Sequence, residues 1–279
     1  IDGEETDCHQ LMMSATPIPR TLAMTFYADL EVSVIDQLPP GRSPIVTKLV
    51  KNERRDELIQ GLFTELEKGR QVYWVCPLIE ESEVLQLKTA VETHAYLQKA
   101  LPNVSVGLIH GKLKGVEKNT IMQDFAMGKI QILVATTVIE VGVDVPNASL
   151  MIIEHAERFG YAQLHQLRGR VGRGSAESIC ILLYGQELSM AAKERLQTLK
   201  ETQDGFIIAE RDLALRGPGE LLGSKQSGEA MLRFIDLQKE AWLIEKTQQL
   251  AKQLLSTYPQ VAEQQLQRWL GNRAEYLKA

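Results

Sequence analysis

Two arginines, Arg170 and Arg173, stand three residues apart with Gly172 between them. The guanidinium group offers a rigid fork of N–H donors that matches phosphate oxygens, and a glycine lets the backbone approach a ligand closely. Two guanidinium groups at this spacing can both reach one polyphosphate. Arginines also form ordinary ion pairs on protein surfaces, so the spacing alone leaves a structural role open.

Polar loops follow two of the apolar segments that we expect to be strands. His110-Gly111-Lys112 comes after the segment ending at Ile109, and Ala135-Thr136 comes after the one ending at Val134. An open parallel sheet binds ligands beyond the carboxyl ends of its strands. We therefore look for ligand contacts in these loops. A predicted helix over residues 161–167 leads into the arginine loop.

The chain lacks the sequence of a complete nucleotide pocket. Residues 107–113 contain two glycines and a lysine, but the Walker A spacing is absent and Leu113 has no hydroxyl for magnesium. The three cysteines lie far apart without a C-x-x-C pair, which argues against a zinc site or a disulfide framework and favours a reducing cytoplasm. We expect no metal site in this chain.

Composition places the chain among globular proteins. It has 279 residues, of which 44% are hydrophobic and 24% charged, enough for one or two domains. It contains neither a membrane-spanning segment nor a signal peptide, so we expect no membrane contact. The net charge of −5 argues against nucleic-acid binding over the whole surface. Local basic patches remain: Arg168, Arg170 and Arg173, and then Arg211, Arg216, Lys225 and Arg233.

The middle of the chain alternates strands and helices. The predicted strands are nearly continuous in apolar residues, as strands buried on both faces are, and they cover residues 72–76, 104–109, 130–134, 149–153 and 178–183. Apolar stripes predict helices between them: Leu58, Ile59, Leu62, Phe63 and Leu66; Val84, Leu87, Val91 and Ala95; and residues 116–127. Gly69 and Gly128 follow two of these helices. The pattern predicts an α/β domain over residues 45–187, a parallel sheet with helices on both faces.

The flanks are of a different kind. Residues 1–44 carry five prolines and are expected to be the tail of an upstream domain. After Tyr184 the strand pattern stops, and residues 190–200 and 206–215 predict a helical pair. A break at residues 216–219 precedes one long helix over residues 229–255. Residues 188–279 are therefore expected to be a mostly helical C-terminal extension.

Three motifs in order identify a family. Residues 14–21 (SATPIPRT) resemble the third motif of superfamily 2 helicases, residues 135–144 the fifth, and residues 166–173 (QLRGRVGR) the sixth. Residues 211–223, with Gln226 after them, resemble the helical hairpin and loop that the RecG family and the transcription-repair coupling factors use to move on duplex DNA. Residues 38–42 (LPPGR) and 216–219 (RGPG) favour the RecG family. The resemblance runs from about Gln10 to the C-terminus and covers the C-terminal part of such a protein.

The resemblance implies a RecA-like second motor domain of an ATP-dependent DNA helicase that remodels stalled replication forks and recombination junctions. It implies that Arg170 and Arg173 act as catalytic arginine fingers and that the ATP-binding residues are Gly142, Asp144 and Gln166. The implied contacts to DNA phosphates are His110, Gly111, Lys112 and Thr136. The residues implied to couple ATP hydrolysis to DNA movement are Arg195, Arg216 and Gln226.

The implied cofactor is ATP with Mg²⁺, held in a site that the first motor domain completes. The implied partners are branched or forked DNA and the upstream wedge and first motor domains, in a monomeric, cytoplasmic enzyme. We expect the chain alone to be inactive as an ATPase. Two alternatives stay open: a motor fragment of a transcription-repair coupling factor, and a non-catalytic module that binds nucleic acid or protein.

Overall fold

The computed structural model describes residues 44–77, 83–136, 145–174, 176–216 and 242–270, together with residues 11, 13, 33, 35, 37 and 240. The chain divides into two compact units, with the boundary near Leu215 on the C-terminal side. Most of the predicted tail at residues 1–44 lies outside the described residues.

A six-stranded parallel sheet forms the first unit, in the order β1-β6-β5-β2-β4-β3. Its strands are β1 (Ile45–Lys51), β2 (Gln71–Val75), β3 (Val106–Ile109), β4 (Ile132–Ala135), β5 (Ala148–Ile153) and β6 (Ser178–Tyr184). The five predicted strands are confirmed to within two residues at each end. β1 was not predicted because it is an edge strand whose lysines, Lys48 and Lys51, interrupt its apolar pattern.

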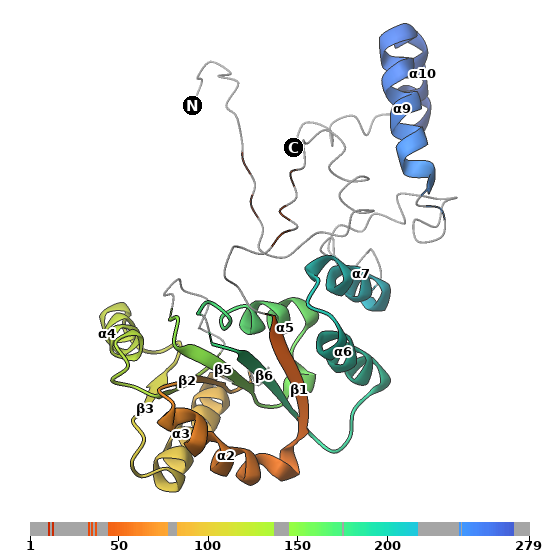
Figure 1. Ribbon diagram of the computed structural model, residues 1–279. Coiled ribbons are helices and arrows are strands. Elements are labelled where there is room, and N and C mark those ends of the chain that lie inside the picture. The colour runs from red at the N-terminus through yellow and green to blue at the C-terminus, as the bar shows by residue number, and fades with distance from the viewer. Residues whose placement is uncertain are drawn as a thin grey trace. The chain divides into compact units, whose positions relative to one another are not determined.

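Helices cover both faces of the sheet, as predicted (Figure 1). Ile59 and Leu62 of α2 (Arg55–Glu67) and Ala90 and Leu97 of α3 (Glu83–Ala100) bury one face. The other face is covered by α4 (Gly115–Ala126), α5 (Tyr161–Arg168) and α6 (Met190–Glu201). Two 3-10 turns, η1 (Asn52–Arg54) and η2 (Ala156–Arg158), follow β1 and β5. Gly69 and Gly128 end α2 and α4 with φ of +78° and +77°, as predicted.

Two predicted helix faces need correction. In α3 the predicted stripe included Val91 and Ala95, which are exposed, whereas Ala90, Thr93 and Leu97 are buried. The small Ala90 lets the helix approach the sheet, and Thr93 finds a polar partner inside, so an alanine and a threonine take the places that the larger Val91 was expected to fill. In α2 the predicted Phe63 is also exposed.

The predicted helical pair after β6 is confirmed as α6 and α7 (Gly205–Arg216). Ser189 caps α6 by accepting a hydrogen bond from the amide of Ala192 at 3.2 Å. The described helices of the second unit are α9 (Trp242–Thr257) and α10 (Pro259–Leu270). The predicted helix over residues 229–255 is confirmed only from Trp242, and α10 was not predicted. No helix among the described residues is long and apolar enough to cross a membrane.

Candidate functional site

The four predicted DNA-contacting residues lie together at the carboxyl edge of the sheet. β3 and β4 are neighbours with Ile109 opposite Ala135, so the residues that follow them are adjacent. The amide of Thr136 donates to the carbonyl of Ile109 at 3.3 Å. Lys112 is exposed, whereas Thr136 is only 4% exposed. The structure therefore leaves Lys112 free to meet a ligand and encloses the hydroxyl of Thr136.

The loop that carries His110, Gly111 and Lys112 is held by the helix after it. Lys118 of α4 donates to the carbonyl of Gly111 at 2.9 Å. At the start of the same helix, the carboxylate of Glu117 accepts the amide of Lys114 at 2.9 Å. These bonds fix the backbone on both sides of Lys112, whose side chain is exposed. The loop is a pre-shaped basic surface.

Lysine, not histidine, supplies the positive charge of this loop. Burial, and then the charges of Lys118 and Lys112, lower the pKa of His110 below its ordinary value of 6.5. The imidazole is therefore neutral at pH 7. In this loop, the positive charge that can attract phosphate at that pH is on the exposed Lys112 and its lysine neighbours.

The arginine loop lies at the amino edge of the sheet, opposite the edge that carries His110 and Lys112. Arg170 and Arg173 stand between the end of α5 and the start of β6, and parallel strands all start at the amino edge. There the loop meets the turn at Pro146, just before β5. The loop reaches the amino edge because α5 carries the chain back across the sheet. The two predicted sets, DNA-contacting and catalytic, are thus on different edges.

Local backbone bonds shape the arginine loop. α5 starts at Tyr161, where the side chain of Gln163 accepts the amide of Gly160 at 3.1 Å. At the other end the amide of Arg170 donates to the carbonyl of Leu167 at 3.0 Å. Gly172 has a φ of +81°, a conformation that glycine adopts readily. Arg170 and Arg173 are half-buried, and the predicted ATP-binding Gln166 is exposed on α5.

Arg168 was grouped with the surface arginines by sequence, but it is only 2% exposed. Its Nη1 donates to the carbonyl oxygens of Leu199 at 2.7 Å and Thr202 at 2.9 Å, at the C-terminal end of α6. Burial lowers the pKa of its guanidinium group. Arg168 therefore joins α5 to α6 beside the arginine loop and is no part of a solvated patch.

Arg195, a predicted coupling residue, joins the same two regions nearer the carboxyl edge. Its Nη1 lies 3.3 Å from the carbonyl oxygen of Glu157 in η2 and also contacts the carbonyl of Phe159. The guanidinium group lies 5.9 Å from the ring centre of Tyr161, the first residue of α5. Arg195 thus ties α6 to the start of the helix that leads into the arginine loop.

A buried ion pair at the carboxyl ends of β2 and β5 was missed. Glu154, 5% exposed, accepts Arg55 Nε of α2 at 2.6 Å. The Arg55 guanidinium lies 5.3 Å and 4.9 Å from the ring centres of Trp74 and Tyr96. The sequence did offer one indication of this pair, because Glu154 directly follows the apolar run of β5. The pair holds α2 and α3 against these strand ends.

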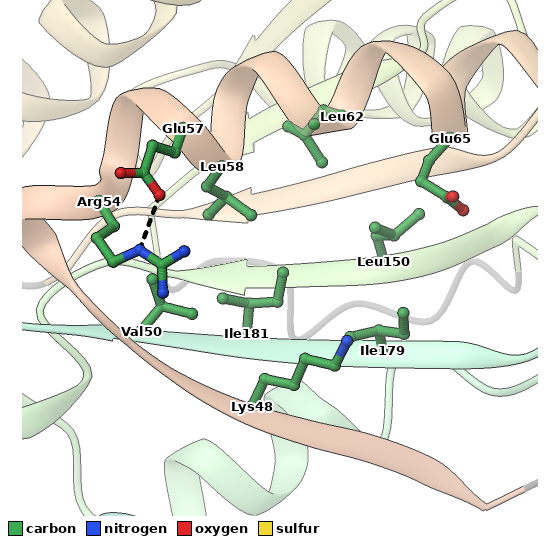
Figure 2. Close-up of a pocket in the computed structure, with 11 residues that line it drawn as sticks. Lys48, Val50, Arg54, Glu57, Leu58, Leu62, Glu65, Leu150, Ile179 and Ile181 are labelled. Atoms are coloured by element: carbon green, nitrogen blue, oxygen red, sulfur yellow. Dashed lines mark hydrogen bonds and ion pairs between the residues drawn. The ribbon is translucent and has the colours of Figure 1, made fainter.

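Several predicted residues lie outside the described residues: Gly142, Asp144 and Gln226. Arg216 is described only as the last residue of α7. Among the described residues, no group of His, Cys, Asp or Glu is arranged to hold a metal ion. A groove of about 420 Å³ lies under α2, over β1, β5 and β6, and Figure 2 shows its apolar floor at Val50, Leu150 and Ile181. None of the predicted site residues lines it.

Two family models match the chain. Residues 53–175 match the helicase conserved C-terminal domain, and residues 202–272 match the C-terminal part of domain 3 of the ATP-dependent DNA helicase RecG. The first match spans α2 to the arginine loop. The second spans α7, α9 and α10. Both predicted parts of the chain, the sheet domain and the helical extension, therefore correspond to parts of RecG-type helicases.

Relatives of known name agree with these models. The chain is 59% identical to the ATP-dependent DNA helicase RecG of Acidithiobacillus ferridurans over 96% of this chain, and 54% identical to that of Escherichia coli K12 over 97%. It spans 39% of the length of each of these relatives.

A solved structure of RecG bound to a three-way DNA junction is 48% identical, with a TM-score of 0.66. It covers 84% of this chain, which covers 30% of that one. These findings agree with the RecA-like fold that the sequence motifs implied. The chain belongs to the RecG family of superfamily 2 helicases, and it matches the C-terminal part of their length.

Proposed function

We propose that this chain is the second motor domain and helical extension of an ATP-dependent DNA helicase that remodels stalled replication forks and recombination junctions. One observation carries the proposal: an arginine loop packs against the turn that ends the Gly142–Asp144 segment, in a chain whose relatives are ATP-dependent helicases. Within the longer protein, residues 1–44 are the tail of the first motor domain, residues 45–187 the second RecA-like domain, and residues 188–279 the translocation hairpin and C-terminal helices.

On the nucleotide side, Arg170 and Arg173 stabilise the charge that develops on the transferred phosphoryl group. Their chemistry fits this role, since one guanidinium group can bind two phosphate oxygens at once. The loop also holds both arginines at one edge of the sheet. Gly142, Asp144 and Gln166 contribute contacts to the nucleotide. The first motor domain completes the site and binds ATP with Mg²⁺.

On the DNA side, the loop of His110, Gly111 and Lys112, with Thr136 beside it, faces the phosphates of the tracking strand. A motor that moves along DNA must ignore sequence, and phosphate contacts carry none. The pre-shaped basic loop supports this assignment, with Lys112 as its exposed charge. By analogy with the relative bound to a three-way junction, the DNA substrate is branched or forked.

Arg195, Arg216 and Gln226 couple ATP hydrolysis to DNA movement. The contacts of Arg195 support this role, because they join α6 to the helix that carries the arginine loop. The chain works with the upstream wedge and first motor domains of its own protein. The whole enzyme acts as a monomer in the cytoplasm.

The test uses the longer protein that contains this chain. ATP hydrolysis is measured with and without a synthetic fork for the parent, Arg173→Ala, Arg173→Lys and the control Arg54→Ala. Arg54 lies on the surface in an i,i+3 ion pair and is expected to be silent.

Loss of an arginine finger lowers turnover by on the order of 10³ or more, and lysine rescues little because it lacks the fork. Parent-like turnover in both Arg173 variants overturns the catalytic role. Fork binding without any DNA-stimulated hydrolysis by the parent identifies a binding module instead.

A further inference from the structure

Gly174, directly after the arginine loop, approaches another backbone too closely for any side chain. A Cβ built at this position lies 2.4 Å from the carbonyl oxygen of Pro146 and 3.2 Å from its carbonyl carbon. Real Cβ atoms essentially never come within 3.0 Å of another heavy atom. The obstructing atom belongs to a main chain, so rotating a side chain cannot relieve the contact.

The turn that Gly174 meets is fixed to the sheet. The amide of Ala148 donates to the carbonyl of Val145 at 3.0 Å, and the carbonyl of Asn147 accepts the amide of Gln71 at 2.9 Å. Val145 is 2% exposed. This turn cannot move without disturbing the starts of β5 and β2.

The arginine loop is fixed on its other side. Val171 is fully buried between the two arginines, and the positive φ of Gly172 sets the direction of the chain just before Arg173. Arg173 therefore stands between one glycine with a left-handed backbone and another in close contact with a second loop. Small changes at either glycine redirect its guanidinium group.

We propose that Gly174 is a positioning residue for Arg173, which locks the arginine loop to the turn that follows the Gly142–Asp144 segment. The contact makes the arginine loop and the turn at Pro146 move as one body. This inference rests on the proposed function of Arg173. It adds that Gly174, a residue without a side chain, sets where Arg173 stands relative to the transferred phosphoryl group.

Gly174→Ala forces the two backbones apart until the new Cβ clears the carbonyl oxygen of Pro146. Displacing a catalytic group by about 1 Å can lower the rate by about 100-fold. We expect Gly174→Ala to lower kcat of the DNA-stimulated ATPase by about 10- to 100-fold with little change in KM for ATP, because Arg173 acts mainly on the transition state.

The experiment compares four variants of the longer protein: Gly174→Ala, Arg173→Ala, the double variant, and the control Gly61→Ala. Gly61 lies within α2, and a Cβ there meets nothing within 4 Å, so its variant retains the parent kcat. If Gly174 acts through Arg173, the double variant is no slower than Arg173→Ala alone.

Thermal unfolding of the 279-residue chain carrying Gly174→Ala completes the design. A folded variant with reduced kcat and unchanged KM supports the inference. Independent, multiplying losses in the double variant overturn it, as does parent-like kcat in Gly174→Ala while Arg173→Ala is impaired. A variant that is unfolded at 25 °C also overturns it, because the contact then holds the fold and not the loop. Parent-like kcat in Arg173→Ala contradicts the proposed function itself, a different outcome from the others.

Discussion

Nη1 of Arg168 lies 2.7 Å from the carbonyl oxygen of Leu199, in the interior of the protein. The last carbonyls of a helix have no partners within the helix and carry partial negative charge. A buried guanidinium group at the C-terminal end of α6 satisfies two of them and is itself stabilised by the helix dipole. The end of α6 is thereby attached to the helix that leads into the arginine loop.

Replacing Arg168 tests this attachment. Arg168→Met fills a similar volume but leaves both carbonyls without a donor, and we expect it to lower the free energy of unfolding by about 2–4 kcal/mol. Urea unfolding of the 279-residue chain measures the change. Arg54→Ala, a surface control, is expected to stay within about 0.5 kcal/mol of the parent. Equal stability of Arg168→Met and the parent would show that the bonds contribute nothing net.

Glu157 predicts a pH dependence of stability. Burial raises the pKa of its carboxyl group, but hydrogen bonds from His155 and from main-chain amides, including that of Gly185, outweigh burial and leave the pKa below its ordinary value of 4.5. A depressed pKa in the folded state stabilises the protein above the unfolded pKa, and this contribution is lost as pH falls through the folded value.

Glu157→Gln is therefore expected to be less stable than the parent by about 1–3 kcal/mol at pH 7. The gap closes as pH falls from about 4.5 toward 3. Thermal unfolding of both proteins from pH 3 to pH 7 measures it. A gap that stays constant over this range would show that ionisation of Glu157 does not matter.

Lys112 predicts a change in the salt dependence of DNA binding. Each phosphate neutralised by a protein cation contributes about one unit to the slope of log affinity against log salt concentration. Lys112→Ala in the longer protein is expected to reduce this slope by about 1. His110→Ala leaves it unchanged at pH 7.5, since the imidazole is already neutral. Lys99→Ala, an exposed lysine on α3, is the control; equal slopes for Lys112→Ala and Lys99→Ala exclude a phosphate contact at Lys112.

The fold was predictable where burial dominated the sequence pattern. β2, β4 and β5 are buried on both faces, and their unbroken runs of apolar residues predicted these strands. β1 was not predicted because Lys48 and Lys51 interrupt the apolar pattern of this edge strand. The face of α3 was misjudged because Thr93 is buried through a bond to Glu154, a contact between residues far apart in sequence.

The membership of the candidate site stays a prediction from the sequence, and its arrangement depends on contacts that the sequence does not reveal. The spacing of Arg170 and Arg173 indicated a pair that acts together. Their edge of the sheet depends on α5, whose eight residues return the chain to the amino side. The burial of Arg168 depends on the end of α6, about 30 residues later, so neighbouring arginines with similar surroundings in sequence have different roles.

The 279-residue chain alone is expected to show no measurable ATP hydrolysis, with or without DNA. Its sequence lacks the Walker A lysine and hydroxyl that phosphoryl transfer requires, and arginines at one edge can only complete a site formed elsewhere. Phosphate release from the purified chain measures this. DNA-stimulated turnover by the purified chain itself would contradict the division of the site between two domains.

Variants of the proposed coupling residues distinguish a mechanical role from a structural one. Gln226 lies far along the chain from Arg170 and Arg173, so we expect Gln226→Ala and Arg216→Ala in the longer protein to retain DNA-dependent ATP hydrolysis while fork unwinding falls by much more. Arg195→Ala is likewise expected to reduce unwinding more than ATP hydrolysis. It should also lower the melting temperature, because it removes bonds to the carbonyls of Glu157 and Phe159. ATPase rate, unwinding rate and melting temperature are measured on the same preparations, with Gly61→Ala as the silent control.

Moving DNA requires a mechanical contact that hydrolysis does not, so unequal loss of the two activities in a stable protein is the mark of coupling. Equal loss of both activities in Gln226→Ala, with a lowered melting temperature, assigns the loop a structural role instead.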